Sequence, residues 1–434
     1  MSTPRSMALG VAALALAMAG GGCTNSPAPR AATPPTSTTS TSTATAGPTT
    51  TTTPAPVTTT TAVAIATSPT TVGPTGASVT AASQSLPPGD AVTGMACGRV
   101  DECFATVTTT ATAPGGPVGR LMSWDGHSWN LLPSTPGTST SAPLPLAGVA
   151  CSGPSNCMAV GGSGGAPISL HWNGGQWSRV TVPAPVVPTD PVGTTADRPT
   201  YVLTAVSCPS GTECVAVGVA RYRTVDTPNN YMFASLWTGS AWSSLNLGPG
   251  DDTQELDSVS CPARNECVAV GVSRHGVEGM QRAPLIEQWN GRAWSGMSIA
   301  TPASTYQPAE LDGVSCPTTT WCMAVGVESD PGSGATASSS AAFTFAGGSW
   351  TATSRAPGVA LSGVSCEAAS QCTAVGGVAN TGLVGAYHRT WASTTPRGPA
   401  GSSQNGPLRA IAPDGAGHYQ LGGYQVTGTA DTTY

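Results

Sequence analysis

The sequence predicts an all-β fold, a β-propeller of repeated four-stranded blades, and three observations support this prediction. A phrase close to Leu-x-x-Val-Ser-Cys-x5-Cys-x-Ala-Val-Gly occurs six times between Cys97 and Cys372. The first cysteines of these units lie 50 to 57 residues apart, a period typical of propellers and other repeat folds. The units are rich in Gly, Val, Ser and Thr, and the chain holds 39 prolines, which excludes a helical solenoid.

The fourth unit shows how one repeat becomes one blade. Alternating apolar and polar residues predict strands at 256–261, 267–272, 284–289 and 294–299. Four short antiparallel strands in a unit of this length match a propeller blade. A β-sandwich would not need near-identical units at a fixed period.

The blade count depends on the two ends of the chain. Segments 408–412 and 418–423 repeat the first two strands of a unit without its cysteines, so we expect a seventh blade. Segment 77–84 resembles a lone strand, and we expect it to complete that last blade and so remove an exposed sheet edge. The sequence thus predicts a seven-bladed propeller over residues 77–434, with six blades followed by a tail as the alternative.

The first 22 residues have the features of an export signal. Arg5 is followed by an apolar run at 7–19 and by three glycines before Cys23. This stretch resembles the lipobox of bacterial lipoproteins, in which the signal is removed and the new N-terminal cysteine is acylated. The resemblance implies a lipid on Cys23; because that pattern prefers an aliphatic residue where Gly20 stands, simple secretion is the alternative.

Residues 23–76 are predicted to be a disordered linker that begins at the acylated cysteine. The segment is dense in Thr, Pro and Ser, has Arg30 as its only charge and shows no apolar periodicity. An extended Pro-rich chain rises about 3.1 Å per residue, so this linker can hold a domain well clear of a membrane.

The cysteine count predicts local disulfides in an exported chain. Of thirteen cysteines, twelve fall into six Cys-x5-Cys pairs, which leaves Cys23 without a partner. A metal site is not predicted, because structural zinc needs four ligands in closely spaced pairs and each blade has only one pair. The expected pairs are Cys97 with Cys103, Cys151 with Cys157, Cys208 with Cys214, Cys261 with Cys267, Cys316 with Cys322 and Cys366 with Cys372.

The charge pattern excludes several functions. All 16 basic residues are arginine, and residues 77–434 hold 14 of them against 22 acids, a net charge of −8. A nucleic-acid partner is not expected of so acidic a domain. The absence of lysine excludes Schiff-base chemistry on a side-chain amine and a Walker-type phosphate loop.

Aromatic pairs five residues apart predict tight hairpins. Trp289 and Trp294 flank an Asn-Gly turn, and the alternation of strand faces puts both rings on one side. We expect such pairs to fill the space between neighbouring blades; a sugar-stacking platform is the alternative.

Loop lengths predict a ligand face. The links from second to third strands and from blade to blade emerge on one face of a propeller, and here they are long and variable, as binding loops are. The alternative is that their charges are merely solvated. The candidate ligand residues are Arg221, Tyr222, Arg223, Asp226, Arg274, His275, Glu278, Glu328 and Asp330.

No catalytic residue, metal ion or cofactor is predicted. The five histidines fall singly in different units, and there is no Gly-x-Ser-x-Gly elbow. A propeller can still bring carboxylates together from distant blades, as glycoside cleavage requires. Carboxylates and an arginine in contact at the channel mouth would therefore favour an enzyme.

Segments 206–218 and 259–271 resemble the repeats of secreted actinobacterial propeller proteins, which implies the fold and little about function. More remotely, segment 123–129 is similar to the Asp-box of sialidase-like propellers, although it lacks the residue between Asp and Gly. Kelch propellers carry a Gly-Gly pair on the second strand, and two units share it, at 161–162 and 376–377.

Together these features predict a monomeric, non-catalytic binding module that is lipid-anchored on the outer face of the cell membrane. Its expected partner is an envelope polysaccharide or another exported protein, bound on the long-loop face, with no membrane contact beyond the lipid. One alternative is an extracytoplasmic glycan-acting enzyme, sialidase-like or another glycoside hydrolase or lyase. The other is a structural spacer.

Overall fold

The computed structural model describes the repeat region and parts of both flanking segments. All statements below concern these residues. They are 63–69, 83–84, 90–109, 118–132, 145–162, 165–185, 199–223, 228–247, 253–275, 281–300, 307–329, 338–353, 360–378, 381–394, 408–413 and 418–423. The predicted signal peptide, Cys23 and most of the predicted linker lie outside them.

The fourth unit forms a four-stranded antiparallel blade, as its alternating pattern predicts. Its strands are β15 (Gln254–Ala263), β16 (Glu266–His275), β17 (Gln281–Trp289) and β18 (Trp294–Gly296), hydrogen-bonded in that order. The first three extend beyond the predicted bounds, because their ladders continue past the apolar core into the polar ends.

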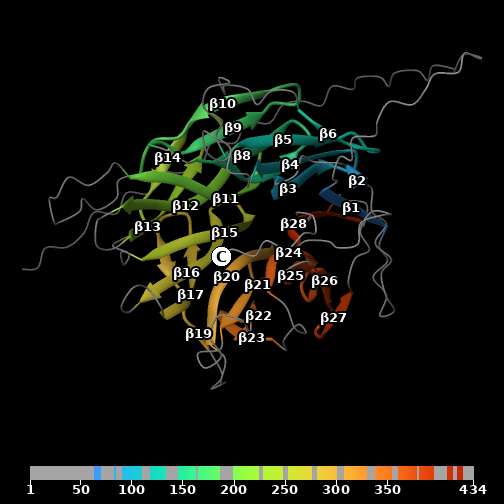
Figure 1. Ribbon diagram of the computed structural model, residues 1–434. Helices are drawn as coiled ribbons and strands as arrows, with labels where there is room; N and C mark the ends of the chain where they lie inside the picture. Colours follow the sequence, from blue (N-terminus) through green and yellow to red (C-terminus); the bar gives the residue numbers. More distant parts are fainter. Residues whose placement is uncertain are drawn as a thin grey trace, which may run out of the picture. The chain divides into compact units, whose positions relative to one another are not determined.

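The other five cysteine-bearing units repeat this arrangement (Figure 1). The first two blades are β3 (Asp90–Arg99), β4 (Glu102–Thr109), β5 (Gly119–Trp124), β6 (Trp129–Leu131) and β7 (Leu146–Gly153), β8 (Asn156–Gly161), β9 (Ile168–Trp172), β10 (Trp177–Thr181). The third is β11 (Thr200–Ser210), β12 (Glu213–Arg223), β13 (Pro228–Trp237), β14 (Trp242–Leu245). The fifth is β20 (Gln307–Thr318), β21 (Trp321–Ser329), β22 (Ser338–Ala346), β23 (Ser349–Ala352), with β19 (Ile299–Ala300) added in parallel to β23. The sixth is β24 (Leu361–Ala368), β25 (Gln371–Val378), β26 (Thr381–Tyr387), β27 (Trp391–Thr394).

The prediction of a β-propeller is thus confirmed, but the prediction of seven blades is wrong: the part of the chain that is described has six blades of four consecutive strands. The cysteine-free C-terminal unit supplies only β28 (Leu408–Pro413) and β29 (His418–Gly423). These two strands lie in an antiparallel sheet of order β2-β1-β29-β28, which we call the closing sheet.

The strand beside β29 is also not the predicted one. It is β1 (Val63–Pro69), which pairs antiparallel with β29 from Ile65 opposite Gly422 to Pro69 opposite His418. Of segment 77–84, only β2 (Ser83–Gln84) is a described strand, and it pairs with β1 at the outer edge. Val63 and Ile65 are β-branched and favour a strand more than the small residues of segment 77–84, which explains the preference.

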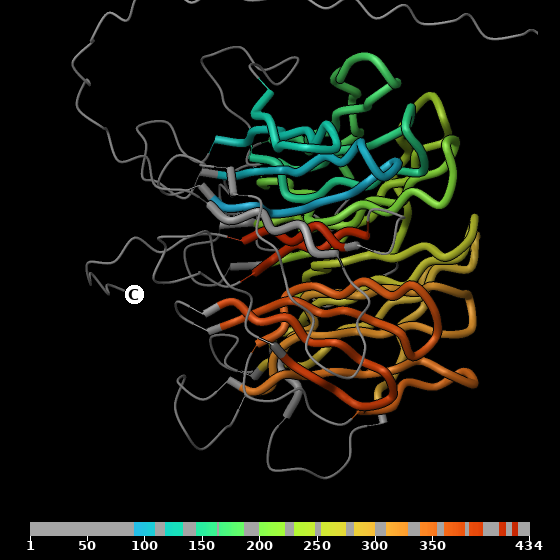
Figure 2. The backbone as a smooth tube through the Cα atoms, turned by 90° about the vertical axis from the view of Figure 1, so that its right-hand side faces the viewer, coloured from blue at the N-terminus to red at the C-terminus, as the bar shows by residue number. Residues whose placement is uncertain are grey.

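The first strands of the blades line the propeller axis. Neighbouring first strands contact one another around the ring, and β28 contacts both β24 and β3, so the closing sheet bridges the sixth and first blades. Figure 2 shows the tight turns of the second to sixth blades along the right-hand edge of the view. The closing sheet covers the apolar faces that the first and sixth blades would otherwise leave open to solvent.

Each of the six cysteine pairs forms a disulfide within its own blade, as predicted. Each bond crosses from the end of the first strand to the start of the second; Cys97 and Cys103, for example, are direct ladder partners. Six such bonds indicate an oxidising, extracytoplasmic environment. No helix among the described residues is long and apolar enough to cross a bilayer.

The aromatic pairs pack between blades rather than facing solvent. Trp289 and Trp294 lie with ring centroids 5.7 Å apart, and both are buried. They belong to a core cluster that includes Val215 and Val217 of the preceding blade. The sequence-based expectation that these rings fill the space between neighbouring blades is therefore met.

The glycine of the repeat phrase permits a close approach of two backbones. A Cβ atom at Gly271 on β16 would overlap the carbonyl oxygen of Glu255 on β15. Gly271 pairs with Leu256, and the ladder slips by one residue immediately afterwards, at Asp257. The same glycine recurs in the second, third, fifth and sixth blades, so the motif encodes a backbone irregularity next to the axis.

Candidate functional site

A β-bulge occurs at the same repeat position in every first strand. In each ladder one residue, directly after the first-strand leucine or its equivalent, has no partner on the second strand. Bulges re-aim side chains, and here all of them lie on strands that line the axis. The seven bulge residues are Thr93, Ala147, Thr204, Asp257, Asp312, Ser362 and Arg409.

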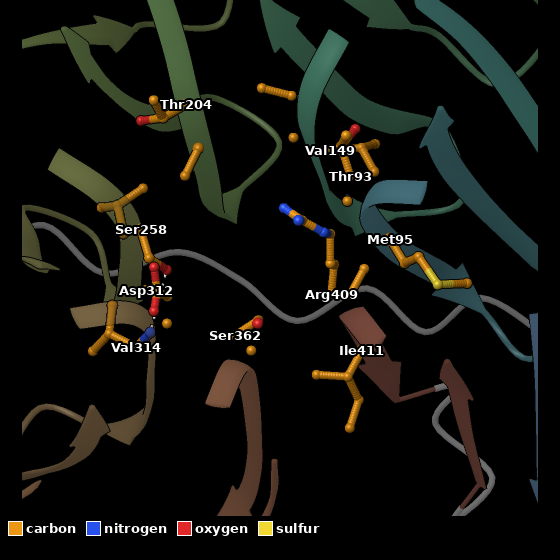
Figure 3. A pocket seen from close by; sticks show the side chains of 18 of the residues that line it. Thr93, Met95, Val149, Thr204, Ser258, Asp312, Val314, Ser362, Arg409 and Ile411 are labelled. Carbon is orange, nitrogen blue, oxygen red and sulfur yellow. Dashed lines mark hydrogen bonds between the residues drawn. The ribbon is translucent and has the colours of Figure 1, made fainter. Parts of the chain in front are cut away.

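A cavity of about 240 Å³ lies between these strands. Figure 3 shows Arg409 extending into it from the closing sheet, with Asp312 on the opposite wall. Hydroxyl groups of Thr93, Thr204 and Ser362 also line it, and no aromatic side chain does so among the described residues. The cavity is therefore polar and carries groups of both charge signs.

Threonine at the bulge position joins one blade to the next. The Thr93 hydroxyl donates to the carbonyl oxygen of Leu146 at 2.9 Å, and the Thr204 hydroxyl donates to that of Leu256. In the fourth and fifth blades the same position holds Asp257 and Asp312. An ionised carboxylate has no proton to donate to a carbonyl, whereas a protonated carboxyl has one.

Both aspartates have a raised pKa. Burial, followed by the charges of Glu255 and Glu310, raises the pKa of Asp257 to about 7. Burial, followed by the charges of Glu310 and Asp257, raises the pKa of Asp312 well above its ordinary value. Oδ2 of Asp257 is buried and has no hydrogen-bond partner among the described residues. These carboxyl groups therefore hold protons at a pH where an ordinary aspartate is ionised.

Two residues before the bulge, a second layer of charges faces the long-loop end of the channel. Glu255 is buried and accepts hydrogen bonds from Arg274 Nη1 at 2.7 Å and Arg221 Nη2 at 3.4 Å. Its equivalent on the fifth blade, Glu310, accepts from Arg282 Nη1 at 2.7 Å. Both glutamates are therefore paired with arginine, the compensation that a buried carboxyl such as that of Glu255 requires.

The structure assembles part of the predicted ligand set. Arg221 and Arg274 both contact Glu255, but from the ends of strands β12 and β16 rather than from loops, because those hairpins are longer than predicted. Glu328 lies buried on β21. Tyr222, Arg223 and His275 are strand residues whose side chains are not described, and Asp226, Glu278 and Asp330 lie outside the described residues.

The sequence reasoning missed Asp312 and Arg409, which line the cavity, together with Asp257, Glu255 and Glu310 on the neighbouring strands. A signal was available, since Asp257, Asp312 and Arg409 occupy a fixed place in the repeat phrase where the other units carry threonine, alanine or serine. A charged residue at a repeat position that the other units fill with a small residue indicates that the position does more than support the blade. Among the described residues, no group of His, Cys, Asp and Glu side chains could hold a metal ion.

No family model matches this chain, and no curated protein matches it. Solved structures with a similar fold include "YCF48 bound to D1 peptide", at 13% identity and a TM-score of 0.44, covering 79% of this chain and 95% of that one. The RRP9 WD40 repeats are 10% identical with a TM-score of 0.45, over 75% of this chain and 85% of theirs. The fucose-specific lectin from Aleuria aurantia is 11% identical with a TM-score of 0.37, over 72% and 98%. At these values the likeness concerns the fold and says nothing of function.

Proposed function

We propose that this chain is an extracytoplasmic glycan-binding module, anchored through a lipid on Cys23 and held away from the membrane by the part of the linker that precedes β1. The observation that carries this proposal is the polar axial cavity. Its lining offers hydroxyl, carboxyl and guanidinium groups, which suit the hydroxyl groups of a sugar. The envelope polysaccharides are the expected partner because the disulfides belong to an oxidising compartment.

The size of the cavity supports a glycan more than a folded protein. Its volume of about 240 Å³ exceeds the roughly 150 Å³ of an engineered cavity that accommodates benzene, so one six-membered ring fits. A protein partner would instead need a surface contact of about 800 Å² on each side. The charged layer of Glu255, Arg221 and Arg274 lies at the long-loop end, where a longer glycan would continue.

A glycan array tests this proposal directly. The chain from residue 24 onward, labelled at its N-terminus, should bind a defined subset of envelope-type glycans. Binding should fall about fivefold when Ser362 is replaced by alanine, since a hydroxyl that meets a ligand contributes roughly 1 kcal/mol. An array on which no glycan binds would contradict the proposal and favour an exported protein as the partner.

A catalytic role is the second candidate, and one observation favours it. Glu255 and Glu310 each contact an arginine, and the neighbouring Asp257 and Asp312 both have a raised pKa. Carboxyl groups whose pKa values differ are the basis of acid and base roles in glycoside cleavage. Release of reducing ends from a bound glycan, abolished in Asp257→Asn and Asp312→Asn, would establish an enzyme. Binding without turnover would leave the module non-catalytic.

A further inference from the structure

We propose that the axial cavity binds the carboxylate of an acidic sugar, with the Arg409 guanidinium as its anion-binding group. This inference rests on the proposed glycan-binding function and names the class of sugar. Arg409 occupies the bulge of β28, is exposed to the cavity and extends into it (Figure 3). A guanidinium offers five N–H donors in a planar fork that matches a carboxylate, so it can hold a ligand besides its contacts within the fold.

The charges around the channel single out Arg409. Arg221, Arg274 and Arg282 contact Glu255 and Glu310 and are absent from the lining of the cavity. Arg409 is the cation that lines the cavity itself among the described residues. An anionic ligand is therefore drawn to the closing-sheet wall of the cavity rather than to the charged layer above it.

The wall opposite Arg409 becomes more favourable to an anion as it gains protons. Asp312 is faced by Glu310 on its own strand, by Asp257 on β15 and by Arg409 on β28, and its raised pKa favours the protonated, uncharged carboxyl as pH falls. A neutral Asp312 carboxyl does not compete for Arg409 and can donate a hydrogen bond to the ligand. Asp257 ionises above about pH 7, and any ionisation of Asp312 as pH rises adds a charge that repels a carboxylate and compensates Arg409.

The neutral part of the lining fits the remainder of a sugar ring. Ser258 Oγ accepts from the Val314 backbone N–H at 3.2 Å, so its own hydroxyl proton is directed elsewhere. The hydroxyl of Ser362 lines the same cavity. These groups can form hydrogen bonds with the hydroxyl groups of the sugar ring. The guanidinium is then needed only for the carboxylate.

The test is calorimetric titration of the chain from residue 24 onward with glucuronate at pH 6 and pH 8, with glucose and methyl glucuronate as uncharged probes. We expect glucuronate to bind at least about tenfold more tightly than its methyl ester at pH 6, because only the carboxylate accepts a charge-assisted hydrogen bond from Arg409. The affinity should fall several-fold at pH 8. Arg409→Gln should abolish the preference for glucuronate, and Arg292→Gln, which removes the same charge from an exposed hairpin turn, should not.

A second variant separates the two roles of the cavity wall. Asp312→Asn keeps the size and the donor but cannot ionise, so its affinity for glucuronate at pH 8 should approach that of the wild type at pH 6. Equal affinity for glucuronate and its ester, or glucuronate binding that Arg409→Gln leaves unchanged, would overturn the inference. If only neutral glycans bind, the glycan-binding function stands and the acidic-sugar assignment fails; if no sugar binds, both fail.

Discussion

The hydroxyl of Ser207 accepts a hydrogen bond from the backbone N–H of Cys261, at 3.0 Å, and so connects the third blade to the fourth. The next two blades repeat this contact, from Cys316 N–H to Ser260 and from Cys366 N–H to Ser315, at 2.9 and 3.0 Å. The serine of the Val-Ser-Cys phrase therefore satisfies an amide beside the disulfide of the following blade.

Replacing Ser260 with alanine should destabilise the propeller. The amide of Cys316, a buried residue, would lose its partner, which costs about 1–3 kcal/mol. Thermal unfolding under non-reducing conditions should show a lower midpoint than the wild type. Ser365→Ala is the matched control, because the equivalent of the next cysteine is Pro413, which has no N–H to donate. Equal losses in both variants would contradict this role.

Removing the charge of Glu287 should stabilise the protein at neutral pH. Burial raises the pKa of this carboxyl from 4.5 to about 7, so the folded state binds the proton more tightly than the unfolded state. Its favourable contribution is full below pH 4.5 and is lost as pH rises to about 7. Glu287→Gln should therefore have a higher melting temperature than the wild type at pH 8, with the difference shrinking towards pH 4. A difference that does not vary with pH would refute this assignment.

The Asn-Gly hairpins depend on a side-chain acceptor. Oδ1 of Asn290 accepts from the N–H groups of Arg292 and Ala293, both at 3.0 Å. Asn290→Ala should lower stability by about 1 kcal/mol, measured by denaturant unfolding. Asn290→Asp should retain it, because Asp125 makes the same two contacts in the first blade. Those contacts lower the pKa of Asp125 to about 2. An aspartate variant as unstable as the alanine variant would disprove this explanation.

Replacing Cys23 with serine should release the protein from the membrane. The prediction follows from the lipobox-like stretch and from the odd cysteine, since the other twelve are paired in disulfides. Cell fractionation should find the variant in the medium and the wild type in the membrane fraction. Fatty-acid labelling of the wild type, absent from the variant, is the positive control. Membrane retention of the variant would rule out the anchor.

Several features could be predicted because each depends on residues that are near in sequence. The cysteine pairs are six residues apart and meet across a tight turn, and Trp289 and Trp294 meet across another. Strand alternation then placed these rings between blades. The closing of the ring was predicted less well, since strand β1 joins β29 across most of the chain, and Val63 and Ile65, which favour this partner, lie in a Thr- and Pro-rich stretch without apolar periodicity.

By itself the sequence determined the repeated blade, its disulfides and the compartment that oxidises them, because periodicity and pairing within a unit are local properties. Only the tertiary structure decided which residues face the axis. A bulge shifts the strand register by one residue, and Asp257, Asp312 and Arg409 come from units far apart in the chain. These charges come close enough to influence one another only when the first strands close into a ring. The cavity and its charges are therefore properties of the assembled blades.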